Sequence, residues 1–121
     1  MDAKAVKAVV AAVLPPHASV NVVPLADIAG RILSDGVDVL LWFPAKTRSD
    51  KAVATRQGVA QALKAAYPDA VLYKIKHTSL GGKPNGLWYS HDGDSLVVGI
   101  KVRLNGLPGK HWNAPLAPFT A

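Results

Sequence analysis

The sequence of 121 residues contains neither cysteine nor glutamate, so all 8 of its acidic residues are aspartates. Without cysteine the chain can form no disulfide, no thiolate zinc site and no iron–sulfur cluster, and it carries no catalytic thiol. No stretch approaches the ~18 consecutive apolar residues that a membrane span requires. Residues 1–14 also lack the order of basic, apolar and cleavage regions that marks a signal peptide. We therefore expect a soluble, cytoplasmic protein that does not associate with membranes.

Basic side chains are in excess: 14 Lys and Arg against 8 Asp give a formal net charge of +6 at pH 7. All of the excess lies between Lys46 and Lys110, where eleven Lys and Arg stand against four Asp. Such a charge balance favours polyanionic partners, because their binding releases condensed counterions. A basic surface is also ordinary in small soluble proteins, so proximity to DNA stays one of two open expectations.

Hydrophobic periodicity and turn residues predict an alternation of helices and strands. Asp2 and Ser49 are suitable N-cap residues for two helices, and Pro15-Pro16 ends the first of them because proline has no N–H to continue the ladder. The predicted elements are a helix over 2–14, a strand over 19–24, one or two helical turns over 25–33, a strand over 37–43, a helix over 49–67, and strands over 71–78 and 95–104.

These elements predict one small α+β domain over residues 1–104. The run 37–43 is apolar on both alternations, which is typical of a central strand covered on both faces. The last two strands are joined by a glycine- and proline-rich loop over 79–94, which favours antiparallel pairing. We expect a mixed or antiparallel sheet of about four strands, packed by the N-terminal helix and one central helix. Residues 105–121 are expected to form an extended C-terminal arm that contains proline and glycine.

Four cations occupy the polar alternations of the last two predicted strands. If these strands pair, they are expected to share one sheet face, where like charges oppose one another and invite a phosphate backbone or an acidic subunit as partner. A solvated face with long side chains spread into water is the plainer interpretation. The four residues are Lys74, Lys76, Lys101 and Arg103.

Trp88 and Tyr89 lie in the loop over 81–94 and are expected to contact another subunit, although aromatic loop residues also stack on nucleobases or fold onto the core. The nearby run His91-Asp92-Gly93-Asp94 has the spacing of neither an EF-hand loop nor a metal-binding histidine pair. We therefore expect Asp92-Gly93 to form a turn rather than a metal site.

Two further segments are candidates for binding. Residues 45–51 bring lysine and arginine to the start of the central helix, which makes an anion site conceivable, although a helix start with solvated charges is the more ordinary interpretation and His17 is isolated among turn residues. In the arm, Trp112, Leu116 and Phe119 are spaced along extended backbone and are expected to contact another subunit.

No enzyme active site is evident in the sequence. The G-x-S-x-G elbow of a serine hydrolase is missing, and Asp38 is the one acid inside an apolar run, where a strand-edge position or a structural pairing is more typical than a catalytic dyad. We expect a protein without enzymatic activity, cofactor or metal.

Three stretches resemble the tail terminator proteins of long-tailed phages. They are the opening helix over 4–14, the strand ending Leu40-Leu41-Trp42-Phe43-Pro44-Ala45 before a helix, and Gly86-Leu87-Trp88-Tyr89-Ser90 before a closing strand over 96–104. The resemblance implies a small α+β subunit in a hexameric ring that caps the tail tube and joins it to the head connector. The family supplies no catalytic residues to transfer, and the basic, glutamate-free composition departs from it.

The resemblance thus implies a non-enzymatic, ring-forming tail terminator or head-to-tail joining protein, located in the virion and assembled in the host cytoplasm. Its partners would be further copies of the chain, tail tube proteins and head connector proteins. The alternative is a basic nucleic-acid-binding module, in which the four strand cations hold phosphates while Trp88 and Tyr89 stack on bases.

Overall fold

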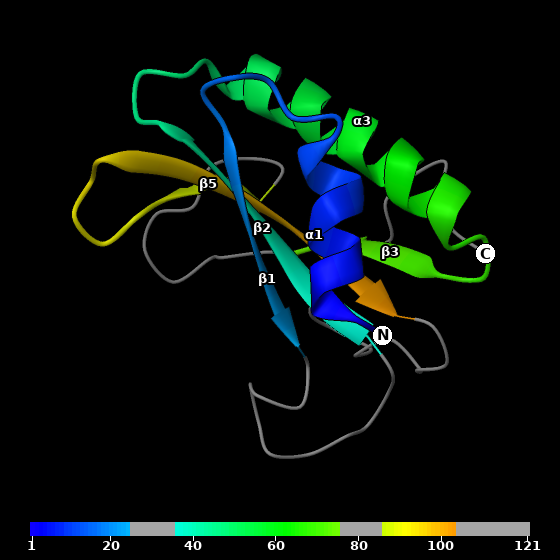
Figure 1. The fold of residues 1–121 in the computed structure, drawn as a ribbon. Coiled ribbons are helices and arrows are strands. Elements are labelled where there is room, and N and C mark those ends of the chain that lie inside the picture. The colour runs from blue at the N-terminus through cyan, green and yellow to red at the C-terminus, as the bar shows by residue number, and fades with distance from the viewer. Residues whose placement is uncertain (25–35, 76–85, 104–121) are drawn as a thin grey trace.

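The computed structural model describes residues 1–24, 36–75 and 86–103. In chain order the described elements are α1 (Ala3–Ala11), β1 (Ser19–Pro24), β2 (Gly36–Pro44), α3 (Ser49–Ala66), β3 (Val71–Lys74), β4 (Trp88–Tyr89) and β5 (Ser95–Arg103). The strands form one sheet in the order β1-β2-β5-β3, with β4 also paired to β5, and every pairing is antiparallel (Figure 1). The expected α+β fold is confirmed, with five strands rather than about four, because the predicted loop contains the short strand β4.

Helix α1 begins as its sequence predicts and ends earlier. The Asp2 carboxylate accepts a hydrogen bond from the Lys4 N–H at 3.0 Å and so caps the first turn. After Ala11 two N–H groups each donate a hydrogen bond to the carbonyl oxygen three residues earlier in the chain. The Val13 N–H donates to Val10 O, and the Leu14 N–H donates to Ala11 O. This tighter turn, which precedes the two prolines, replaces the last predicted turn of α-helix.

Helix α3 has the predicted buried stripe but a different N-cap. Arg48 occupies the cap position with an extended backbone and makes no side-chain cap bond, while Ser49 is the first helical residue. The prediction of Ser49 as N-cap is therefore wrong by one position. Asp50 stands in the first turn, where the helix dipole favours a carboxylate. The buried residues of α3 are Ala52, Arg56, Val59, Ala60 and Leu63.

Both described helices pack on the same side of the sheet (Figure 1). Val6 and Val10 of α1 are fully buried there, in one cluster with the stripe of α3. The sheet contributes alternate residues of its strands to this cluster, namely Val37, Val39, Leu41 and Phe43 of β2, Leu72 of β3, and Leu96, Val98, Ile100 and Val102 of β5. Burying this much apolar surface is the main stabilising contribution to the fold.

The other alternation of the same strands forms the opposite side of the sheet, which we call the second face. Directly paired residues point to the same side of an antiparallel sheet. Trp42 is paired with Val97, and Val97 with Trp88; Leu40 is paired with Gly99. A Cβ atom at Gly99 would lie 2.6 Å from Cδ1 of Ile75, so the Ile75 side chain packs directly over this glycine.

Candidate interaction surfaces

The register separates the strand cations that were expected to share one face. In the pairing of β3 with β5, Lys101 lies opposite Tyr73, whereas Lys74 lies opposite Ile100, a core residue on the helix-covered side. Lys74 and Lys101 therefore belong to opposite sides of the sheet, and the prediction of a shared cationic face is wrong. Lys76 lies outside the described residues.

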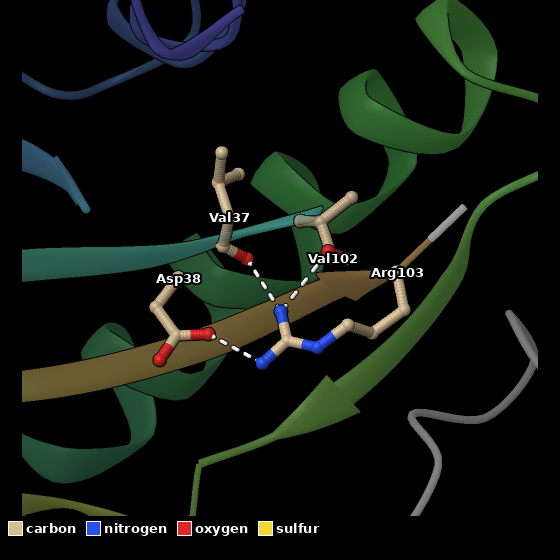
Figure 2. A network of polar contacts seen from close by, with 4 residues as sticks. All are labelled: Val37, Asp38, Val102 and Arg103. Carbon is tan, nitrogen blue, oxygen red and sulfur yellow. Dashed lines mark hydrogen bonds and ion pairs between the residues drawn. The ribbon is translucent and has the colours of Figure 1, made fainter. Parts of the chain in front are cut away.

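Arg103 is on the second face with Lys101 but is 8% exposed. Its Nη2 donates a hydrogen bond to Oδ1 of Asp38 at 2.9 Å, and its Nη1 donates to the carbonyl oxygens of Val37 and Val102 at 3.0 and 3.1 Å (Figure 2). These bonds satisfy the guanidinium inside the protein, so Arg103 acts within the sheet rather than toward a polyanion. Of the two expectations for Asp38, a strand-edge position or a structural pairing, the structure shows the pairing.

Tyr73 lies beside this ion pair on the second face. Burial raises the pKa of the Tyr73 hydroxyl, and the nearby positive charge of Arg103 acts in the opposite direction. The hydroxyl consequently stays protonated near neutral pH. A second buried cation, Arg56 of α3, is 3% exposed, and burial lowers its pKa from the ordinary value.

The aromatic residues of the second face are partly accessible. Trp42 and Trp88 are half-buried on either side of Val97, which is fully buried. Tyr89 follows on the opposite alternation and is 44% exposed. The structure thus places Trp88 on the same side of the sheet as Trp42, and Tyr89 on the other side. Trp112, Leu116 and Phe119, the expected contacts of the arm, lie outside the described residues.

The run from Ser90 to Ser95 forms the turn between β4 and β5. Gly93 adopts a positive φ of 78° and donates a hydrogen bond to Ser90 O at 2.9 Å, which confirms the turn predicted at Asp92-Gly93. Asp92 Oδ1 accepts from the Ser90 hydroxyl at 2.5 Å and from the Asp94 N–H at 3.0 Å. The Ser90 bond, followed by the Asp94 bond, lowers the pKa of Asp92. Within the part of the chain that the structure describes, no three His or Asp side chains cluster as metal ligands.

A pocket of about 350 Å³ lies at the end of the sheet where β2 leads into α3. Its apolar lining, which we call the floor, includes three prolines and one phenylalanine, Pro15, Pro16, Pro44 and Phe43. The basic side chains of the lining, which we call the rim, come from two segments distant in sequence, namely His17 before β1, and Lys46, Arg48 and Lys51 around the start of α3. We call this site the basic-rimmed pocket.

The sequence pattern predicts half of this pocket. It identified the basic segment over 45–51, but it left His17 isolated, because nothing in the pattern shows that residues 15–18 fold against the end of β2. The only indication was indirect: Pro15-Pro16 and Pro44 mark the ends of a predicted helix and a predicted strand, and the ends of such elements pack against neighbouring segments.

No family model, curated protein or solved structure matches the chain. None of the helices that the structure describes is long and apolar enough to cross a membrane.

Proposed function

We propose that this protein is a non-enzymatic structural protein that assembles into a homo-oligomeric ring and acts as a tail terminator, or head-to-tail joining protein, of a phage virion. The support from sequence is the resemblance in the opening helix, in the strand that ends at Ala45, and in the run from Gly86 to Ser90. An α+β subunit with an N-terminal helix on its sheet is compatible with that resemblance. The proposed partners are further copies of the chain and the tail tube and head connector proteins.

The observation that carries the proposal is the two-sided apolar character of the central strands. β2 and β5 bury one alternation beneath both described helices. The other alternation bears Leu40, Trp42 and Val97, and no described helix lies over it. Leu40 and Trp42 are only half-buried. Large apolar side chains at a partly accessible surface are typical of the centre of a protein interface.

A second copy of the chain is the occupant that we assign to this face. A ring of identical subunits forms when the second face of one subunit packs against a different surface of the next and the rotation closes. Aromatic side chains such as Trp42 and Trp88 supply much contact area at little cost in side-chain entropy. Repetition of one such contact around a ring needs no cofactor and no reaction.

The experiment is a measurement of the particle mass by light scattering over a range of protein and salt concentrations, together with negative-stain imaging. We expect a discrete ring-sized oligomer. Leu40→Lys places a charge on the second face and should shift the mass to that of the monomer. Val13→Lys is the matched control, because Val13 is 48% exposed in the turn after α1 and is not a residue of the second face; it should leave the mass unchanged.

Circular dichroism of both variants separates loss of assembly from loss of folding. A strict monomer for the unmodified protein, or equal masses for the unmodified protein and a folded Leu40→Lys variant, would count against the second face as the ring contact. Enzymatic turnover or a bound cofactor in purified material would count against the structural role.

The nucleic-acid-binding alternative relied on four cations gathered on one sheet face. Lys74 and Lys101 lie on opposite sides, and Arg103 is ion-paired with Asp38. That alternative therefore loses the arrangement on which it depended, and we do not carry it forward as a second function.

A further inference from the structure

The basic-rimmed pocket, at the end of the sheet beside the start of α3, is not used by the ring contact. We propose that it binds an acidic segment of another protein, with an apolar side chain of that segment on the floor and its carboxylates against the rim. The inference goes beyond the proposed ring, because binding at this pocket requires neither the second face nor a second copy of the chain.

The floor of the pocket offers apolar surface with no N–H donor at its prolines, and two of their three carbonyl oxygens are hydrogen-bonded within the chain. Pro15, Pro16 and Pro44 have no N–H to donate. The carbonyl oxygens of Pro15 and Pro44 already accept hydrogen bonds within the chain, from Ala18 N–H at 3.1 Å and from Thr47 N–H at 2.9 Å. Polar ligand atoms would therefore lose hydrogen bonds to water here without replacement, whereas an apolar side chain would gain burial.

Phe43 gives the floor a fixed position. It is 4% exposed and belongs to the core cluster beneath the helices, so the pocket is built against the packed interior rather than against a loop. The proline rings on either side restrict the backbone further. A pocket with rigid walls binds with a smaller loss of conformational entropy than one that has to form around its ligand.

The rim carries positive charge, and no acidic side chain lines the pocket. Lys46, Arg48 and Lys51 fall within six residues, and His17 adds a fourth basic group from the other segment. An ion pair at the rim joins Arg48 to Asp50 at 3.1 Å, with side chains 82% and 69% exposed. An exposed pair of this kind is weak and exchanges readily for a better partner, so the rim remains available to carboxylates.

The whole chain indicates that the acidic partner is a different protein. The chain has no glutamate and a net charge of +6, so a second copy would bring mainly like charge to this rim. A single-stranded nucleic acid would need a basic track along which successive phosphates lie. Here the cations line one pocket of about 350 Å³ together with apolar side chains. Such a pocket suits a peptide with one apolar side chain between carboxylates better than it suits a run of phosphates.

The test uses fluorescence anisotropy with a labelled peptide, Glu-Glu-Leu-Glu-Glu-Leu, and the full chain. We expect saturable binding that weakens with salt and that is lost when glutamine replaces every glutamate or serine replaces both leucines. Reversing Lys46 and Lys51 together to Glu should weaken binding about tenfold, because two attractive contacts become repulsive. Reversing Lys4 and Lys7 of α1, both exposed and outside the pocket, makes the same change in net charge and should alter binding about twofold or less.

Equal binding by the two double variants would overturn the proposal, since the net charge rather than the pocket would then hold the peptide. Undetectable binding by the unmodified protein, or retention of the serine-substituted peptide, would overturn it as well. Tighter binding of an oligothymidylate that displaces the peptide would assign the rim to nucleic acid instead.

If the Lys46/Lys51 variant fails to fold by circular dichroism, the single change Lys51→Ala at an exposed position of α3 serves in its place. A monomeric protein that binds the peptide would refute the ring and leave this inference standing.

Discussion

Asp38 of β2 lies directly opposite Lys101 in the sheet register, yet its carboxylate bonds diagonally to Arg103, with Oδ1 2.9 Å from Nη2. The two side chains are only 14% and 9% exposed. The same guanidinium also binds the carbonyl oxygens of Val37 and Val102, so one side chain fastens the two central strands near the point where β5 ends. Because these atoms are largely withdrawn from water, the pair is far more sensitive to loss of one partner than an exposed pair.

Asp38→Asn should lower the free energy of unfolding by about 2–4 kcal/mol, because it leaves the largely buried Arg103 charge without its counter-charge. The measurement is denaturant unfolding followed by circular dichroism. Arg48→Gln, which breaks the exposed pair with Asp50, is the control and should cost less than about 0.5 kcal/mol. Comparable losses of unfolding free energy in the two variants would show that the Asp38–Arg103 pair stabilises the fold no more than the exposed pair does.

Gly99 is required by the side chain that packs over it. An added Cβ would stand 2.6 Å from Ile75 Cδ1 and 3.1 Å from Ile75 Cβ, too close to be relieved by rotation of the terminal methyl alone. Gly99→Ala should therefore destabilise the protein by about 1–3 kcal/mol through overpacking. In an Ile75→Ala background the same change should cost much less. Additive losses in the double variant would mean that the glycine serves some other purpose.

Gly58 presents the opposite case. It lies in the middle of α3, is exposed, and has no atom within 4 Å of the position that a Cβ would take. Gly58→Ala should raise the free energy of unfolding by about 0.5–1 kcal/mol, since alanine loses less backbone entropy in a helix. Thermal unfolding measures this directly. A loss of stability, or a change in the assembled mass, would indicate that this helix face contacts a partner.

Periodicity predicted the elements well because each element carries its own pattern. The stripe of α3, the ends set by prolines and the alternation within β5 are all local properties of the sequence. The relation between strands is not local. Shifting one strand by a single residue exchanges its two faces, and so no pattern within β3 or β5 reveals that Lys74 lies opposite Ile100. Only the 45–51 half of the basic-rimmed pocket was predicted, for the same reason, because His17 and Lys46 come to line one pocket only through the pairing of β1 with β2.

The turn before β5 provides a prediction about pH. The Ser90 hydroxyl and the Asp94 N–H both donate to the Asp92 carboxylate and lower its pKa below the ordinary value of 3.8. A depressed pKa in the folded state means that the ionised form is the one stabilised. Its contribution is fully present above the unfolded pKa and disappears as the pH falls through the folded pKa.

Ser90→Ala should therefore raise the pKa of Asp92 toward 3.8, which an NMR titration of the side-chain carboxyl carbon would follow. Ser90→Thr keeps a hydroxyl and should leave the pKa close to that of the unmodified protein. The Ser90 hydroxyl also accepts from the Ser95 N–H at 3.1 Å, so the alanine variant loses a second bond that does not titrate. Its deficit in stability should consequently shrink, but not vanish, as the pH falls below the range in which Asp92 ionises. A deficit that stays constant with pH would show that the Ser95 bond alone matters and that the contact between Ser90 and Asp92 contributes nothing to folding.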